Sequence, residues 1–132
     1  MFEIVFDPAQ RVLHLKLTGF WTMETMARFA KELHTTSTMI SERYGTFATL
    51  SDSRDFPIQS AEVSERFERI RARGLEAKSG PTAIVVASQL SKFQAERLLK
   101  TKHNRVFLDR AEAEAWLAEQ SASWGKDAVA DA

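Results

Sequence analysis

The sequence contains no cysteine. Disulfide bonds, thiolate nucleophiles and cysteine-based zinc sites are therefore excluded. Glycine is scarce, and its five residues are isolated at positions 19, 45, 74, 80 and 125, so the chain has no glycine-rich loop to hold a phosphate or a dinucleotide. The histidines His14, His34 and His103 lack the spacing of metal ligands. We expect neither a metal ion nor a cofactor.

Charge of one sign does not dominate, because 18 lysines and arginines balance 18 aspartates and glutamates. This balance argues against a protein whose main task is to bind nucleic acid. Long hydrophobic runs are also missing, since the longest, Ala83–Ala87, is far too short for a transmembrane segment. Residues 1–8 lack the basic and apolar regions of a signal peptide, so we expect a cytoplasmic protein.

What the chain does contain is the pattern of one α/β domain. At 132 residues, 44% of them hydrophobic, it is long enough to bury a substantial core. Leu13, Leu15 and Leu17 alternate with polar residues, which predicts a strand with one wet face, paired in a hairpin with residues 2–6. Helical and strand patterns then alternate, which implies parallel strands. We predict a mixed five-stranded sheet with packed helices in the order ββαβαβαβα.

Caps and turns set the predicted boundaries. A strand over 46–50 precedes a polar turn, and the next helix runs over 60–73 and ends at Gly74. A later helix is predicted to start at the cap Ser91. The domain spans 1–119, and a shift to Ala, Ser and Asp indicates a flexible C-terminal tail over 120–132, in which Trp124 is the residue that would dock. The open edge of the hairpin offers a surface for a homodimer.

The order of elements and four of the joints between them resemble the STAS / SpoIIAA-like family. The likeness is carried by Gly19–Thr22 before the first helix, Leu50–Phe56 at the third strand, Arg105–Phe107 at the last strand and Glu114–Leu117 in the closing helix. The chain is most similar to stand-alone bacterial SpoIIAA-like proteins related to lipid-binding CRAL-TRIO domains. The resemblance implies a non-enzymatic regulatory or protein-interaction module in signalling, like the anti-sigma factor antagonists.

Ser60 falls on the phosphoserine position of that family. The family motif is Asp-Ser-Ser-Gly, whereas this chain has Gln59, Ser60, Ala61 and Glu62. Three of the four positions differ, and Glu62 would place a carboxylate beside a phosphate. The resemblance therefore implies a module without the usual phosphoserine switch. Two interpretations of Ser60 stay open: a phosphoacceptor, or a helix cap that contributes about 1 kcal/mol.

Polar residues around the end of the third strand form the candidate partner surface: Asp52, Arg54, Asp55 and Gln59. Ligands of α/β sheets bind at the carboxyl ends of strands, which favours a contact site here. The alternative is a solvated turn with a local ion pair among Asp52, Arg54 and Asp55. An enzyme using Asp52 or Asp55 ranks last, because no nucleophile or cofactor loop accompanies these carboxylates.

Apolar residues at the joint before the first helix offer a second function. Phe20, Trp21 and Met26 could line a pocket, as the CRAL-TRIO resemblance suggests, and the protein would then carry a small apolar ligand or a lipid. Residues of these types at this place are also typical of a core. A filled core with an exposed patch near Ser60 would favour the interaction module, and an apolar cavity would favour the carrier.

Overall fold

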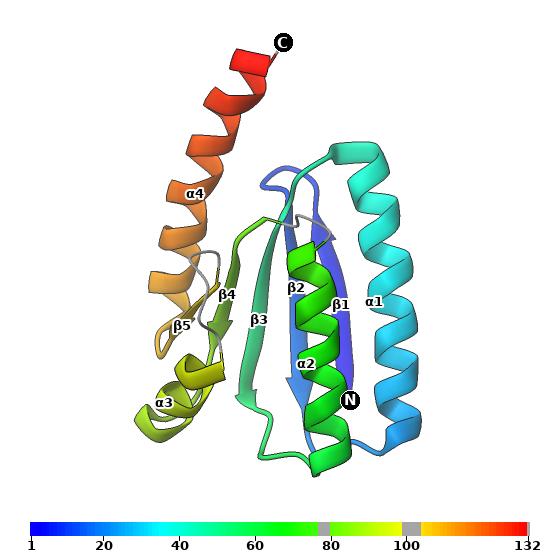
Figure 1. Ribbon diagram of the computed structural model, residues 1–132. Coiled ribbons are helices and arrows are strands. Elements are labelled where there is room, and N and C mark those ends of the chain that lie inside the picture. Colours follow the sequence, from blue (N-terminus) through cyan, green and yellow to red (C-terminus); the bar gives the residue numbers. More distant parts are fainter. Residues whose placement is uncertain (77–79, 99–103, 132) are drawn as a thin grey trace.

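The computed structural model describes the backbone of residues 1–76, 80–98 and 104–131, and the side chains of residues 1–70, 80–96 and 104–121. Strands and helices follow each other in the predicted order (Figure 1). Their bounds are β1 (Phe2–Asp7), β2 (Val12–Thr18), α1 (Met23–Tyr44), β3 (Ala48–Asp55), α2 (Ala61–Glu76), β4 (Thr82–Val85), α3 (Gln89–Leu98), β5 (Asn104–Phe107) and α4 (Arg110–Asp131).

The strands form one five-stranded sheet in the order β1-β2-β3-β4-β5. β1 pairs antiparallel with β2, with Phe2 opposite Leu17, and each later strand adds in parallel. The predicted mixed sheet is therefore confirmed. A parallel arrangement has a consequence for function, because β2, β3, β4 and β5 all end at the same edge of the sheet. We call this edge, with the loops and helix starts that follow it, the C-terminal edge.

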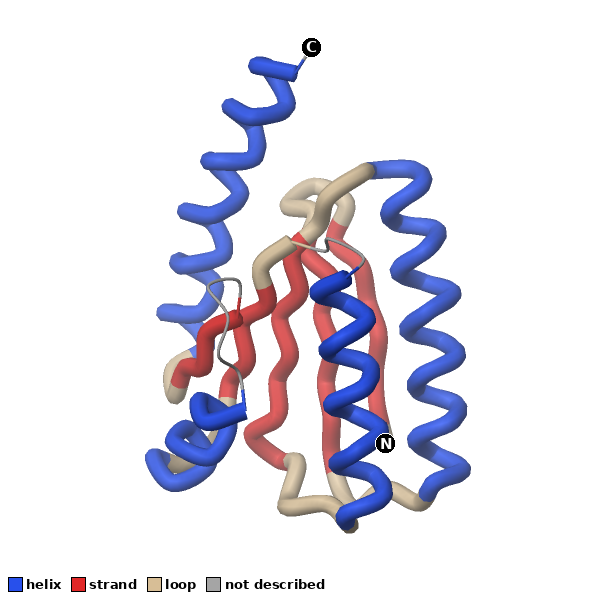
Figure 2. The backbone as a smooth tube through the Cα atoms, viewed as in Figure 1, coloured by secondary structure: helices blue, strands red, loops and turns tan. Residues whose placement is uncertain are grey.

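Helices cover the two faces of the sheet unequally (Figure 2). Leu13, Leu15 and Leu17 of β2 pack towards α1 and α2, and Ile84 of β4 lies on the same face in a cluster with Ala95 of α3. α4 packs on the other face through Ala113 and Leu117, over β3, β4 and β5. In the described part of the chain, the backbone of α4 does not approach β1 or β2 closely, so most of that part of the face carries no helix.

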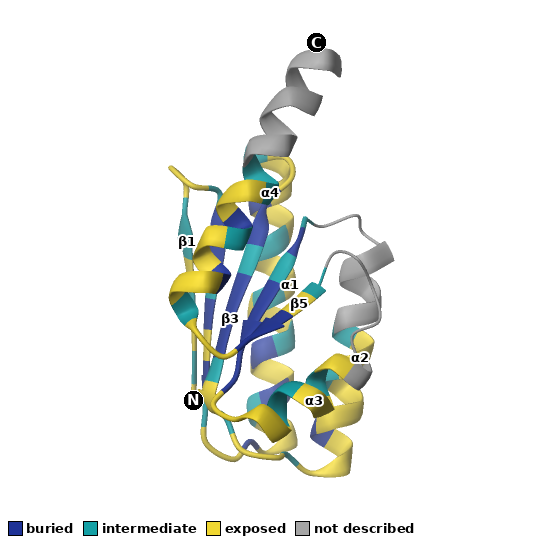
Figure 3. Cartoon of the chain, turned by 90° about the vertical axis from the view of Figure 1, so that its left-hand side faces the viewer, coloured by how far each residue is buried: buried dark blue, intermediate teal, exposed yellow. Residues whose placement is uncertain are grey.

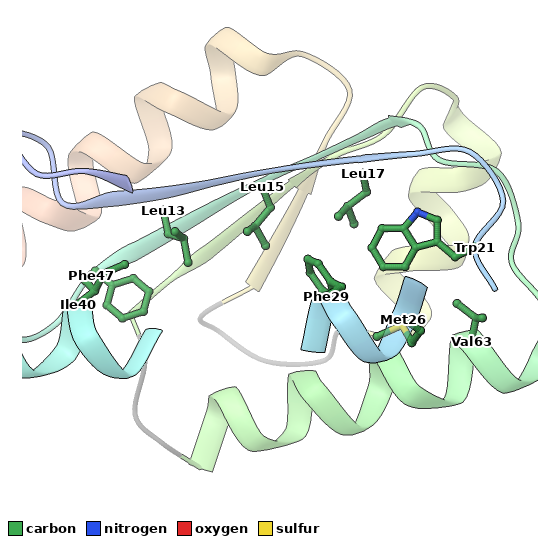
Figure 4. Close-up of a cluster of buried hydrophobic side chains, with 9 residues drawn as sticks. All are labelled: Leu13, Leu15, Leu17, Trp21, Met26, Phe29, Ile40, Phe47 and Val63. Atoms are coloured by element: carbon green, nitrogen blue, oxygen red, sulfur yellow. The ribbon is translucent and has the colours of Figure 1, made fainter. Parts of the chain in front are cut away.

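The largest core cluster lies between the sheet, α1 and α2 (Figure 4). Trp21, Met26, Phe29 and Val63 gather there beside the leucines of β2. Met26 and Phe29 are at most 1% exposed and lie three residues apart, so they form a buried apolar stripe on α1. None of the described helices combines the length and the apolar character needed to cross a membrane.

Two predicted boundaries around β3 and α2 are wrong. The strand continues to Asp55, so Asp52 and Arg54 lie in a strand and not in a turn. The extension of this strand was not predicted because it contains Ser51 and Ser53, and serine is not typical of strands. α2 does not end at Gly74 but runs to Glu76. The cost of glycine inside a helix is only about 1 kcal/mol, and the residues that follow favour helix.

The later helices also start or end differently from the prediction. α3 begins at Gln89, and its cap is Ser88, whose Oγ accepts the Ser91 N–H at 3.1 Å. Both serines suit a cap, and the chain uses the one closer to the end of β4. α4 continues to Asp131 through the segment expected to be a tail, since an alanine-rich sequence favours helix. The side chain of Trp124 lies outside the described residues, so its docking stays a prediction.

Candidate functional site

Asp52 lies at the centre of an ionic network near the end of β3. It is 8% exposed although it is charged, and it faces α4. Arg54 holds it from two residues along the strand: Nε donates to Oδ1 at 2.9 Å and Nη2 to Oδ2 at 2.8 Å. Arg110 in the first turn of α4 places Nη1 3.7 Å from Oδ2. A bidentate guanidinium matches the plane of a carboxylate, so this geometry is specific for arginine.

The network fixes the protonation state of Asp52. Hydrogen bonds from the Arg54 side chain hold the pKa of this carboxyl below its ordinary value, against the opposing effect of burial. The same contact raises the pKa of Arg54. A carboxylate with a lowered pKa and two cationic neighbours is a weak proton acceptor at neutral pH. Its arrangement therefore suits the joining of β3 to α4 better than acid–base chemistry.

Gln59 ties two loops of the C-terminal edge together. Its Oε1 accepts the Trp21 N–H at 2.8 Å, and its Nε2 donates to the carbonyls of Gly19 at 3.0 Å and Pro57 at 2.7 Å. The loop before α1 and the loop before α2 are thus held in one arrangement. Gln59 was predicted to belong to the partner surface. Its hydrogen bonds are made within the protein, where they fix the shape of that surface.

Ser60 caps α2. Its Oγ accepts the Val63 N–H at 3.3 Å, and its carbonyl accepts the Ser64 N–H at 2.9 Å. This is the contact that the cap interpretation requires. The residue is exposed at the C-terminal edge. A role as phosphoacceptor stays a prediction.

The three residues predicted to line an apolar pocket lie in different environments. Trp21 and Met26 belong to the core cluster and are 5% and 0% exposed, whereas Phe20 is 76% exposed. Trp21 packs against the rings of Phe2, Phe29, Phe56 and Phe67 with centroids 5.0–5.7 Å apart. These contacts fill the space beneath the start of α1. Phe20, the residue before Trp21, is exposed to solvent instead.

Exposed apolar side chains gather at the C-terminal edge. Apart from Val5 and Met39, each large apolar residue exposed in the described part of the chain belongs to it: Met1, Phe20, Met23, Ile58, Leu90, Phe93 and Leu108. They lie in the loops, in the first turns of the following helices or, for Phe93, in the second turn of α3, and Met1 precedes β1, which runs antiparallel to β2. Figure 3 shows exposed stretches of the chain, in yellow, at this edge of the sheet. We call these seven residues the apolar row. Isolated exposed apolar residues are ordinary, but their concentration on one surface is typical of an interaction site.

The apolar row was not predicted, because its members are far apart in the sequence and none belongs to a motif. Only the sheet order brings them together. The nearest signal in the sequence is an apolar residue in the segment between a strand and the following helix, as at Phe20, Ile58 and Leu90. Because parallel strands end at the same edge of the sheet, these recurring apolar residues are brought together along that edge.

Acidic residues accompany the apolar row. Glu24, Glu62 and Glu112 lie in the first turns of α1, α2 and α4, and each is exposed. Asp55 and Asp109, also exposed, end β3 and precede α4. The arginines at this edge, Arg54 and Arg110, are paired with Asp52. Lys92 in the first turn of α3 and the Met1 ammonium are further cations of this edge, but the carboxylates named here outnumber the cations, so the edge is net acidic although the whole chain is neutral.

A small hollow lies on the uncovered part of the α4 face. Its volume is about 110 Å³, and it is lined by Glu3, Val5, His14, Leu15, Lys16, Leu50, Asp52 and Arg110. A space of this size holds only a few water molecules. Within the described residues, no group of three or more acidic or histidine side chains is arranged to hold a metal ion.

Comparison with known proteins identifies the fold. No family model matches the sequence, and no curated protein matches it. Among solved structures, the chain is similar to an uncharacterised protein of the DUF3478 family with a SpoIIAA-like fold from Shewanella loihica PV-4. The TM-score is 0.66 at 19% sequence identity, over 88% of this chain and 93% of that one. The chain therefore has a SpoIIAA-like fold, as the resemblance in its sequence implied.

Proposed function

We propose that this protein is a non-enzymatic protein-interaction module that binds its partner with the C-terminal edge. The observation that carries the proposal is the apolar row. Exposing large apolar side chains to water is unfavourable. Covering them with another protein is favourable by about 25 cal/mol for each Å² of apolar surface that is buried. A contact surface at this edge also agrees with the end of β3 as the predicted partner surface.

A catalytic role has less support. The buried carboxylate, Asp52, is engaged by Arg54 and Arg110 and has a lowered pKa, so it does not resemble a general acid or base. The other carboxylate of this strand, Asp55, is exposed to solvent. We therefore propose binding without chemistry.

A carrier of apolar ligands also has less support than an interaction module. A ligand beneath α1 would have to displace the rings packed around Trp21, which lie 5.0–5.7 Å apart. Displacing packed aromatic side chains costs several kcal/mol. The filled core, together with an exposed patch that includes Ile58 near Ser60, favours the interaction module.

Regulation by phosphorylation is not included in the proposal. Ser60 is occupied as the cap of α2, and Glu62 in the same first turn would repel a phosphate. We propose that partner binding depends on the apolar row and not on a modified serine.

A pull-down combined with native mass spectrometry tests the proposal. The wild-type protein is compared with a double variant, Phe20→Ser with Ile58→Ser, and with the control Met39→Ser, which changes an exposed residue of α1 outside the C-terminal edge. We expect the double variant to lose a stoichiometric partner that the wild type and the control retain. Equal capture by all three proteins would refute a binding role for this edge.

A further inference from the structure

The chemistry of the C-terminal edge specifies its partner. Resting on the proposed function, we infer that the edge binds a basic amphipathic α-helix of another protein. Three observations carry the inference: the order of the apolar row along the strands, the sign of the surrounding charge, and the state of the helix N-termini at the edge.

The order of the apolar row follows the order of the strands. Phe20, Ile58, Leu90 and Leu108 follow β2, β3, β4 and β5 in turn, so they succeed one another along the edge. The strand ends are not level: Asp52 of β3 pairs with the last residue of β4, whereas β3 itself continues to Asp55. An amphipathic α-helix presents apolar side chains along one side, at positions i, i+3 or i+4, and i+7, so it can contact apolar residues that succeed one another along an edge.

The charge around the row selects a basic helix. Glu24, Asp55, Glu62, Asp109 and Glu112 are exposed along the edge. Lysine or arginine side chains flanking the apolar face of a bound helix would lie near these carboxylates. Opposite charges across an interface steer association and suppress wrong partners. The same carboxylates disfavour acidic helices and anionic membrane surfaces.

Each helix N-terminus at this edge already has one of its free N–H groups occupied by a side chain of this protein. Each helix that starts here has its own side-chain cap: Thr22 Oγ1 accepts the Thr25 N–H, Ser60 Oγ the Val63 N–H, Ser88 Oγ the Ser91 N–H and Asp109 Oδ1 the Ala111 N–H. A helix N-terminus attracts a phosphate or carboxylate through its free N–H groups. These caps compete for such groups, so the edge offers apolar and acidic contacts in their place.

Designed peptides provide the test. An 18-residue helical peptide carries leucine on one face and lysine on both flanks, with a fluorescent label for anisotropy. One comparison peptide replaces every lysine by glutamate, and a second scrambles the order so that leucines surround the helix. We expect the basic amphipathic peptide to bind at least about tenfold more tightly than either comparison peptide. Its affinity should fall as added salt screens the charges.

Matched variants locate the binding. Ile58→Ser and Leu90→Ser should each lower the affinity for the basic peptide about tenfold. This is the loss expected for an apolar contact near the centre of an interface. Met39→Ser should bind like the wild type. Circular dichroism of every variant checks that the fold is retained.

Other results would overturn the inference. Equal binding of the acidic or scrambled peptide, no binding of the basic peptide, or an equal loss in Met39→Ser would each contradict it. So would binding to vesicles containing phosphatidylglycerol, or a mass doubling at high concentration that Ile58→Ser abolishes, because a membrane or a second copy would then occupy the edge. A pull-down that depends on Phe20 and Ile58 without any peptide preference would leave the proposed function intact and refute only the helical partner.

Discussion

At the scale of single residues, Asp52 shows how the fold tolerates a buried charge. Arg54 satisfies both carboxylate oxygens from the same strand, and Arg110 adds a longer contact from α4. Because the guanidinium groups are partly exposed, the positive charges keep their hydration while the carboxylate loses much of its own. The sequence predicted a local ion pair among Asp52, Arg54 and Asp55, but neither the choice of Asp52 nor its burial. Burial depends on α4, which lies far away in the chain.

The Asp52–Arg54 pair should make stability depend on pH. The pKa of Asp52 is lower in the folded chain than its ordinary value of 3.8, so the pair stabilises the fold above that pH and the contribution is lost as the pH falls through the folded-state pKa. We expect Arg54→Gln to be less stable than the wild type at pH 7. The difference should shrink towards pH 2 in urea denaturation.

Arg69→Gln is the matched control for this experiment. Arg69 pairs with Glu65 on α2, and both side chains are 65% exposed. Exposed helix pairs contribute only about 0.3–0.5 kcal/mol. If Arg54→Gln lost no more stability than Arg69→Gln, or lost as much at pH 2 as at pH 7, the role assigned to the Asp52 network would be wrong.

Ser60→Ala separates the two interpretations of this serine. As a cap, Ser60 contributes about 1 kcal/mol, and its replacement should lower the free energy of unfolding by that amount without changing partner binding. Ser64→Ala, one turn further along α2, should leave stability nearly unchanged. An unchanged melting temperature with loss of the partner would instead indicate a phosphoacceptor or contact residue.

At the scale of elements, the joints at the C-terminal edge are fixed by side chains and not by secondary structure. Gln59 bridges the loops before α1 and α2. We expect Gln59→Ala to cost about 1 kcal/mol, because the partly buried Trp21 N–H loses its acceptor. Hydrogen–deuterium exchange at Trp21 should become faster.

Gln59→Glu refines that experiment. Glutamate keeps an oxygen for the Trp21 N–H but has no N–H for the carbonyls of Gly19 and Pro57. It should therefore protect the Trp21 amide better than alanine while leaving the loop before α1 less firmly held. Identical exchange in Gln59→Ala and the wild type would show that the bridge has no structural role.

The elements were easier to predict than their ends. The alternation of Leu13, Leu15 and Leu17 and the apolar stripe of α1 report the contacts that each element makes, so their types followed from the sequence. The last residues of β3 were missed because Ser51 and Asp52 are polar, and only the finished structure shows that both are buried. The bridge from Gln59 to Trp21 could not be predicted, since nothing local in the chain links the two loops.

At the scale of the whole molecule, topology creates the site. Residues of the apolar row come from loops that the sequence separates widely, and parallel strands collect them at one edge. The predicted order of elements implied such an edge. No local pattern in the sequence indicated which loops would expose apolar residues to solvent. A fold can thus be predicted from periodicity while its contact surface requires the arrangement in space.

The apolar row should be dispensable for folding. Exposed residues away from caps and networks usually change stability by less than about 0.5 kcal/mol, so Phe20→Ser with Ile58→Ser should unfold at the same urea concentration as the wild type. The double variant should also bind less of a fluorescent dye specific for exposed apolar surface, whereas Met39→Ser should reduce dye binding much less. A large loss of stability would mean that the row supports the core.

The place of Met1 has a practical consequence for any affinity experiment. Its ammonium group donates to the Thr18 carbonyl at 2.9 Å, beside the loop that carries Phe20, whereas α4 carries the chain away towards the opposite end of the molecule (Figure 1). A purification tag fused before Met1 would remove this ammonium contact and crowd the surface on which the partner is expected. A tag placed after α4 leaves that surface open, so it is the orientation for immobilising the protein.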